Sequence, residues 1–276
     1  MKERAFNTAF FFILLLLSVL FIFPVFIVLL NSFKLKFSIA TAPFVLPNSE
    51  TFSGLENYIT GINSTGFLSA IGWSLFITVF SVAVLIIFTS MTAWYIVRVK
   101  TAGTKILYLS LVFSMIVPFQ MVMFTMSKIA NTLHLDNPLG IVFIYLGFGA
   151  GLSVFMFSGF IKTVPKTIEE AATIDGCNTL EVFWLVVFPS LKPPAITVAI
   201  LNTMWIWNDY LLPYLVIGKD YKTIPIAVQY LKGGYGSVDM GAMMAMLVLS
   251  IIPVVVFYSL CQKYIIKGVA AGAVKG

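Results

Sequence analysis

Apolar and polar residues are strongly segregated along this chain, in long apolar runs separated by short polar segments. A helix that crosses a bilayer needs about 20 mostly apolar residues. Strands of a membrane barrel would instead alternate between apolar and polar over about ten residues, and these runs do not alternate. We therefore expect six membrane-spanning helices, at residues 9–30, 67–96, 106–126, 141–161, 194–217 and 243–264.

The composition supports the same class of protein. Of the 276 residues, 60% are hydrophobic and 10% are charged, and the mean hydropathy is +1.01. A soluble domain carries about 25% charged residues. The first run follows Lys2 and Arg4, but it is longer than a signal-peptide core and no small-residue cleavage site follows it. We expect an all-α polytopic membrane protein, with one transmembrane domain over residues 1–276 and an uncleaved first span.

The placement of Lys and Arg predicts the orientation, because these residues concentrate in cytosolic segments. With a cytosolic N-terminus, 11 of the 17 basic residues fall in inner segments and the remaining six in outer ones. Both termini should then be cytosolic. The net charge of +6 reflects this topology, so we expect no nucleic-acid partner. Cys177 and Cys261 would lie toward the reducing side, and we expect no structural disulfide.

Two outer segments are longer than simple connectors. Residues 31–66 contain the sequence Gly-Leu-Glu-Asn-Tyr at 54–58, which suits either a folded loop with a short helix or a plain solvated connector. Residues 218–241 contain Lys-Gly-Gly-Tyr-Gly at 232–236. These glycines lack the following Lys-Ser or Lys-Thr of a phosphate-binding loop, so we expect no nucleotide site there.

The inner segment at 162–193 contains a short polar helix between two spans. Pro165 suits a first helical turn, and Glu169 and Glu170 lie close to the positive end of the helix dipole. Gly176 suits a left-handed C-terminal cap. The pattern predicts a helix of about ten residues, and isolated helices of that length are marginal in water. We expect this helix to need a partner surface.

A second inner helix should follow directly. Asn178 and Glu181 have capping-box spacing. The next apolar positions, at 180, 183, 184 and 187, form one helical stripe that should face the membrane surface or neighbouring spans. Pro189 and the pair Pro193–Pro194 should end this helix and turn the chain into the fifth span.

Four motifs resemble those of the permease subunits of bacterial ABC importers. Glu170-Ala171-Ala172, then Gly176 and Val186-Val187-Phe188-Pro189, is similar to the EAA loop of that family, although Val186 and Phe188 stand where isoleucine and leucine are typical. Trp207-Asn208-Asp209-Tyr210, the outer sequence at 54–58 and the tail at 267–276 resemble the carbohydrate-uptake branch related to the maltose importer. Nearly the whole chain is similar to the shorter, six-span permease of that branch.

The resemblance implies a permease subunit of an ATP-driven sugar importer in the bacterial inner membrane, forming half of the translocation path. The implied partners are a second permease, two ATPase subunits, an extracellular or periplasmic sugar-binding protein, the sugar and the bilayer. ATP and Mg²⁺ would bind the ATPase subunits, and this chain would bind no cofactor. Closure of the ATPase dimer would move the spans through the EAA helix. The implied coupling residues are Glu169, Glu170, Ala171, Ala172, Asp175, Gly176 and Pro189.

The resemblance also implies a tail near the ATPase, formed by Gly272, Ala273, Val274, Lys275 and Gly276. In the fifth span, Trp207, Asn208 and Asp209 would line the translocation path or the contact with the second permease. Charged residues inside spans usually face a bundle interior or water. The alternative is that Asn208 and Asp209 cap a helix break before Pro213. Which sugar is carried, and whether this subunit contacts it, stay open.

Further features of the spans have structural explanations. Gly147, Gly149, Gly151 and Ser153 form a small-residue surface that suits close helix packing. Pro118 and Pro253 should kink the third and sixth spans. The single histidine, His134, is expected in a solvated loop.

Missing motifs define the remaining alternatives. The sequence has no phosphate-binding loop and no catalytic Ser/His/Asp or Cys/His set, so we do not expect an enzyme and we expect ATP hydrolysis to come from a partner. A stand-alone secondary carrier or channel would need several ionisable residues inside the spans, where we place only Asp209. A membrane enzyme or assembly factor would need a clustered polar site.

Overall fold

The computed structural model describes the backbone of residues 2–218, 220–231 and 239–273, and the side chains of residues 7–264 apart from residue 9 and those two gaps. Over these residues the chain is helical, with one isolated bridge between Lys34 and Phe52 and no strand. The predicted all-α membrane fold is confirmed. The chain divides into two compact units, residues 1–68 with 227–255, and residues 69–226 with 256–276.

The spans are formed by four long helices and two bent pairs. The long ones are α1 (Lys2–Asn31), α4 (Phe67–Arg98), α7 (Pro138–Ile161) and α14 (Met240–Ala273). The bent pairs are α5 (Ala102–Ser114) with α6 (Phe119–Thr132), at 108°, and Thr179–Ser190 with α11 (Lys192–Asn208), at 76°. Up to six spans result if each pair is one span. The six-span topology stays a prediction.

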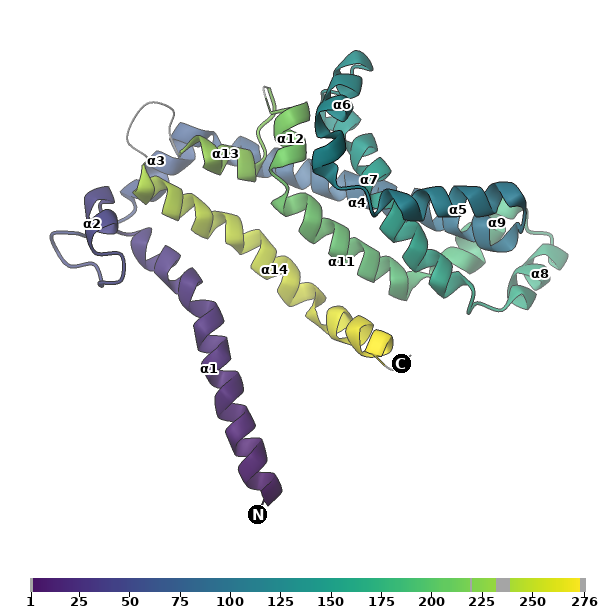
Figure 1. Cartoon of the computed structure of the whole chain (residues 1–276), viewed down its shortest axis with the longest axis horizontal. Coiled ribbons are helices and arrows are strands. Elements are labelled where there is room, and N and C mark those ends of the chain that lie inside the picture. Colours follow the sequence, from purple (N-terminus) through teal and green to yellow (C-terminus); the bar gives the residue numbers. More distant parts are fainter. Residues whose placement is uncertain (1, 219, 232–238, 274–276) are drawn as a thin grey trace. The chain divides into compact units, whose positions relative to one another are not determined.

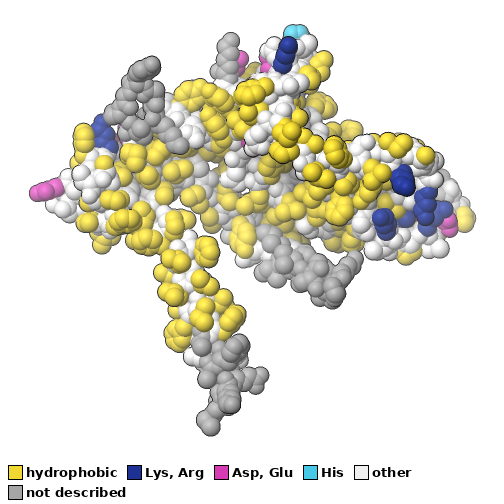
Figure 2. All heavy atoms as spheres, viewed as in Figure 1, with side chains coloured by type: hydrophobic (Ala, Val, Ile, Leu, Met, Phe, Trp, Pro, Cys, Tyr) yellow, Lys and Arg dark blue, Asp and Glu magenta, His cyan; other side chains and the backbone are white. Residues whose placement is uncertain are grey.

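In the first unit, α1 exposes apolar side chains along much of its length (Figure 2). The loop after it contains α2 (Lys36–Thr41) and α3 (Glu56–Thr65), so the folded form of this loop is confirmed. Asn57 on α3 fixes the loop, because its amide donates to the carbonyls of Ser32 and Lys34 at 2.9 and 2.8 Å. The Lys34 ammonium in turn donates to the Ala42 carbonyl at 2.9 Å.

In the second unit, α5 and α7 run side by side (Figure 1). A Cβ atom at Gly151 would lie 2.5 Å from the Leu111 carbonyl oxygen, and one at Gly149 would lie 2.7 Å from Leu85. These contacts confirm that the small-residue surface permits close packing. Gly147 does not contribute, since a Cβ there would meet nothing within 4 Å.

The prolines act differently in the two spans where kinks were predicted. Pro118 lies at the break between α5 and α6, where the chain turns by 108°. Pro253 lies inside α14, which continues through it to Ala273. The fifth predicted span also differs in its bounds, because α11 ends at Asn208 and a separate helix, α12 (Leu211–Val216), follows it.

The segment between α7 and α11 folds as four short elements. They are α8 (Lys166–Ile174), α9 (Thr179–Val182), the π-helical turn η1 (Phe183–Val187) and α10 (Phe188–Ser190). A last short helix, α13 (Ile224–Tyr230), precedes α14. A buried cluster that includes Phe157, Phe183 and Leu191 joins this segment to α4 and α7. The cluster is the platform on which α8 rests.

Candidate coupling site

The bounds of α8 follow from its sequence. Pro165 has extended backbone angles directly before the first helical residue, Lys166, where its missing N–H leaves no helical bond unmade. At the other end, Gly176 has φ +94°. The Gly176 N–H donates to the Thr173 carbonyl at 3.1 Å, and the Cys177 N–H donates to the Ala172 carbonyl at 3.0 Å. This is a Schellman cap, so the predicted glycine stop is confirmed.

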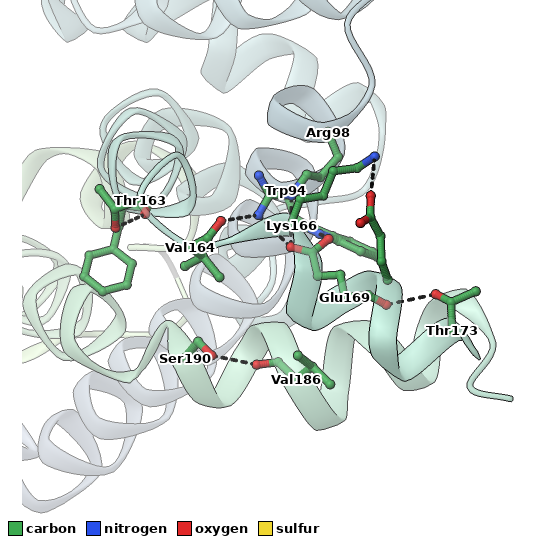
Figure 3. Close-up of polar contacts among 11 residues, drawn as sticks. Trp94, Arg98, Thr163, Val164, Lys166, Glu169, Thr173, Val186 and Ser190 are labelled. Carbon is green, nitrogen blue, oxygen red and sulfur yellow. Dashed lines mark hydrogen bonds and ion pairs between the residues drawn. The ribbon is translucent and has the colours of Figure 1, made fainter. Parts of the chain in front are cut away.

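One ion pair fastens α8 to the end of α4 (Figure 3). The Arg98 guanidinium donates to one Glu169 carboxylate oxygen, from Nε at 2.9 Å and from Nη2 at 2.6 Å. The other oxygen accepts from the Trp94 indole at 2.9 Å. Nη2 also donates to the Val164 carbonyl at 3.0 Å. The two charged side chains are 17% and 9% exposed, and charge-assisted bonds of this kind are strong.

We call the Arg98–Glu169–Trp94 contact the latch. It gives α8 one face that packs against the rest of the chain, which we call its inner face, and an opposite, exposed face, which we call its outer face. Glu169 and Ala172 are buried on the inner face. Glu170 lies on the outer face and pairs with Lys166 at 3.1 Å, with both side chains more than half exposed. The other predicted coupling residues, Ala171, Asp175, Gly176 and Pro189, are also exposed.

Glu169, like the buried Ala172, therefore differs from the rest of the predicted coupling set. Its carboxylate is engaged within the chain and is not presented on the surface. The exposed set is Glu170, Ala171, Asp175, Gly176 and Pro189. Ala171 and Gly176 carry little or no side chain, so another polypeptide can approach this exposed part of the chain closely.

The second helix predicted between α7 and α11 begins as expected, but its hydrogen-bond period changes along its length. Asn178 and Glu181 form the capping box, with bonds of 2.7 to 3.0 Å. The Phe188 N–H then donates to the carbonyl of Phe183, five residues back, which is a π-helical bond.

The widened turn divides the predicted apolar stripe. Phe183 and Val187 are buried, whereas Leu180 and Trp184 are 58% and 42% exposed. Phe183 and Val187 pack against the neighbouring helices, as predicted. A place at the membrane surface for Leu180 and Trp184 stays a prediction, and the widened turn departs from the 3.6-residue period on which the stripe was based. Pro189 also does not end the helix, which runs to Ser190 before the bend at Leu191.

In the fifth span, Asp209 lies at the break between α11 and α12. Its carboxylate accepts from the Leu211 N–H at 3.0 Å and from the Tyr145 hydroxyl at 3.1 Å. The alternative that Asn208 and Asp209 cap a helix break is confirmed for Asp209. Trp207 is buried, and the exposed Asn208 donates to the Met204 carbonyl of its own helix at 2.7 Å. A role for these residues in the translocation path stays a prediction.

Besides Tyr145, three residues that make contacts between helices were not found from the sequence. Arg98 and Trp94 are more than 70 residues from Glu169, although their spacing of four places them on one helix face. Asn202 on α11 is the third, since its amide donates to Ser153 on α7 at 3.3 Å. A polar residue inside an apolar helix was the available signal.

Two predicted segments lie wholly or partly outside the described residues. Val274, Lys275 and Gly276 of the tail, and the glycine-rich sequence at 232–236, lie outside the described residues; Gly272 and Ala273 belong to the backbone of α14. Over the described residues, no group of three or more His, Cys, Asp or Glu could hold a metal ion.

The comparisons with known proteins agree on one family. The model of the family described as "Binding-protein-dependent transport system inner membrane component" matches residues 85–271. The chain is 41% identical over 262 residues to "Probable starch degradation products transport system permease protein AmyC" of Thermoanaerobacterium thermosulfurigenes, covering 95% of this chain and 94% of the relative. It is 34% identical to "Multiple sugar-binding transport system permease protein MsmG" of Streptococcus mutans, over 99% of each chain.

A solved structure supports the fold. It is described as a bacterial ABC transporter involved in the import of the acidic polysaccharide alginate, and it matches with a TM-score of 0.78 at 23% identity, over 96% of this chain and 98% of that one. These findings favour the permease over the stand-alone carrier. The chain belongs to the family of inner membrane components of binding-protein-dependent transport systems, and it is a multi-pass membrane protein.

Proposed function

We propose that this chain is a permease subunit of an ATP-driven sugar importer, forms half of its translocation path and couples ATPase closure to alternating access. The family and the names of the two relatives, one for starch degradation products and one for multiple sugars, support the sugar class. The observation that carries the coupling role is α8, a short helix clamped on one face by the latch and exposed on the other.

The assembly that we propose contains a second permease, two ATPase subunits that bind ATP and Mg²⁺, and a sugar-binding protein outside the membrane. Both termini of this chain lie in the cytosol, since 11 of its 17 basic residues then fall in inner segments. This orientation puts α8 on the side of the ATPase subunits. The tail from Gly272 to Gly276 lies near the same partners.

In this proposal the outer face of α8 enters a cleft of the ATPase subunit. Glu170 meets basic or polar groups there, Ala171 permits close approach, and Gly176 allows the turn that ends the helix. The inner face stays fixed to α4 through the latch. Movement of the ATPase is thereby passed to the spans.

The test is the substitution Gly176→Asp. An Asp at this position adds charge and bulk at the contact, where φ is +94°, and we expect sugar uptake to fall at least tenfold while ATPase activity no longer responds to the substrate. The matched control is Gly66→Asp, because Gly66 also has a positive φ of 62° and open space around it. Full substrate-stimulated ATPase and uptake in a well-expressed Gly176→Asp transporter would contradict the proposal.

The sugar itself requires a transport measurement. Maltose-like oligosaccharides, raffinose-type galactosides, polyols and glycerol phosphate are the candidates to compare. We expect competition by one oligosaccharide class in the reconstituted complex with its binding protein. Uptake unaffected by any sugar or polyol would contradict the sugar class while leaving the coupling test valid.

A further inference from the structure

A basic pocket lies next to the latch. It is an open pocket with a volume of about 650 Å³, bounded by the end of α4, the start of α5 and the end of α7. Among the residues whose side chains are described, four basic ones line it, namely Arg98, Lys100, Lys105 and Lys162, and no acidic one does. Figure 2 shows Lys and Arg side chains gathered around this end of the second unit.

Three of the four charges of this pocket have no ion-pair partner within the described part of the chain. Arg98 is paired with Glu169, but the ion pairs found there include none to the three lysines. The pocket also receives the N-terminus of α5, which has no acidic residue in its first turn and has Lys105 at its fourth position. A cation at the positive end of a helix dipole is unfavourable, and a bound anion would relieve it.

A buried hydroxyl points to a ligand independently of these charges. Ser158 on α7 lines the pocket and is 1% exposed. Its Oγ has no hydrogen-bond partner among the residues that the structure describes. Buried hydroxyls in proteins are nearly always bonded, so an acceptor or donor from outside the chain would complete this one.

The surface next to the pocket indicates which class of anion fits best. Farther along α5, an open groove of about 540 Å³ is lined by Leu109, Ser110, Val112, Phe113 and Ile116. From Lys105 to Phe113 the helix rises about 12 Å. A basic pocket followed by an apolar groove on one helix matches a phosphate headgroup followed by acyl chains, and a free phosphate would need only the pocket.

We propose that this pocket binds the headgroup of an anionic phospholipid, with the acyl chains along the apolar groove of α5. Lys105 and Lys162 pair with the phosphate, and Ser158 donates its hydroxyl to a headgroup oxygen. The cytosolic side assigned to these lysines by the proposed orientation is where membranes carry anionic lipids. The site is distinct from the exposed face of α8.

The test uses the full chain in detergent and a phosphatidylglycerol probe with a photoreactive acyl chain. For Lys105→Gln/Lys162→Gln we expect about 25-fold weaker labelling affinity, since each basic residue near a lipid surface contributes about fivefold. Lys128→Gln/Lys192→Gln removes the same charge at two exposed positions and should keep the affinity. In the unsubstituted chain the label should fall on residues 109–116.

Ser158→Ala separates binding from folding. It removes an unbonded hydroxyl, so without lipid its melting temperature should be unchanged or higher, and its affinity for phosphatidylglycerol should fall about fivefold. Three results would overturn the proposal: equal labelling by a phosphatidylcholine probe, equal loss in the control double variant, or complete displacement of the lipid by millimolar inorganic phosphate.

Discussion

Replacing Arg98 by methionine should release α8 from the rest of the chain. Methionine keeps much of the length of the side chain but removes three hydrogen bonds, two to the Glu169 carboxylate and one to the Val164 carbonyl. Glu169 would keep its bond from Trp94. It would also keep a charge in a site where its side chain is 9% exposed.

The expected magnitude follows from this burial. Removing one partner of a buried ion pair costs about 3 to 5 kcal/mol, because the other charge is left uncompensated. Arg98 is 17% exposed and Glu169 has a second donor, so we expect about 3 kcal/mol, at the lower end of that range. A nine-residue helix has little stability of its own. The opening equilibrium of α8 should therefore rise about a hundredfold.

Hydrogen–deuterium exchange of the peptide covering residues 166–174 measures this opening. The full chain in lipid nanodiscs should lose about a hundredfold in amide protection over α8 and little over α7. The control is Lys166→Gln, which breaks an ion pair with Glu170 whose side chains are 65% and 55% exposed. Such an exposed pair contributes about 0.5 kcal/mol or less, so protection should change by about twofold.

A double substitution tests the physical reason. Arg98→Met/Glu169→Met removes both charges, and replacing a buried pair by apolar residues is often neutral. We expect it to regain most of the protection lost in Arg98→Met. If the double variant exchanges as fast as the single one, or if Arg98→Met exchanges like the unsubstituted chain, the latch does not hold α8 in place.

Two further predictions concern packing in the second unit. Gly149→Val should lower the yield of folded protein and its melting temperature, because overpacking reduces the free energy of unfolding by about 1 to 3 kcal/mol. Gly147→Val should be tolerated, because a Cβ there meets nothing within 4 Å. Equal melting temperatures for the two variants would contradict this prediction. Tyr145→Phe removes the hydroxyl that bonds Asp209 and should lower the free energy of unfolding by about 1 kcal/mol, measured by thermal unfolding. An unchanged free energy would mean that the backbone donors alone hold Asp209.

Local features of this chain could be predicted because their causes lie within a few residues. The start of α8 after Pro165, its stop at Gly176 and the capping box from Asn178 each depend on the chemistry of one turn. The apolar runs likewise depend only on length and hydropathy. The break at Pro118 was expected as a kink, but its angle of 108° depends on packing that the local sequence does not specify.

Contacts between distant segments could not be predicted in the same way. No local pattern states that Glu169 faces Arg98, because that choice depends on how α4 and α7 pack. The π-helical turn before Pro189 is of the same kind: a fixed 3.6-residue period cannot anticipate one bond that reaches back five residues. The family resemblance predicted that α8 has a surface for a partner, but not that Glu169 lies on its inner face.

The latch has a mechanical consequence for the long helix that carries it. From Arg98 back to Ser74, α4 is one unbroken helix about 36 Å long, and the Ser74 hydroxyl accepts the Ile224 N–H at 2.8 Å. A tilt of about 10° about the Arg98 end would move the Ser74 end by about 6 Å. Through the Arg98–Glu169 pair, α4 thus acts as a lever arm. A small rotation at α8 becomes a displacement about as large as one helical turn at the far end of α4.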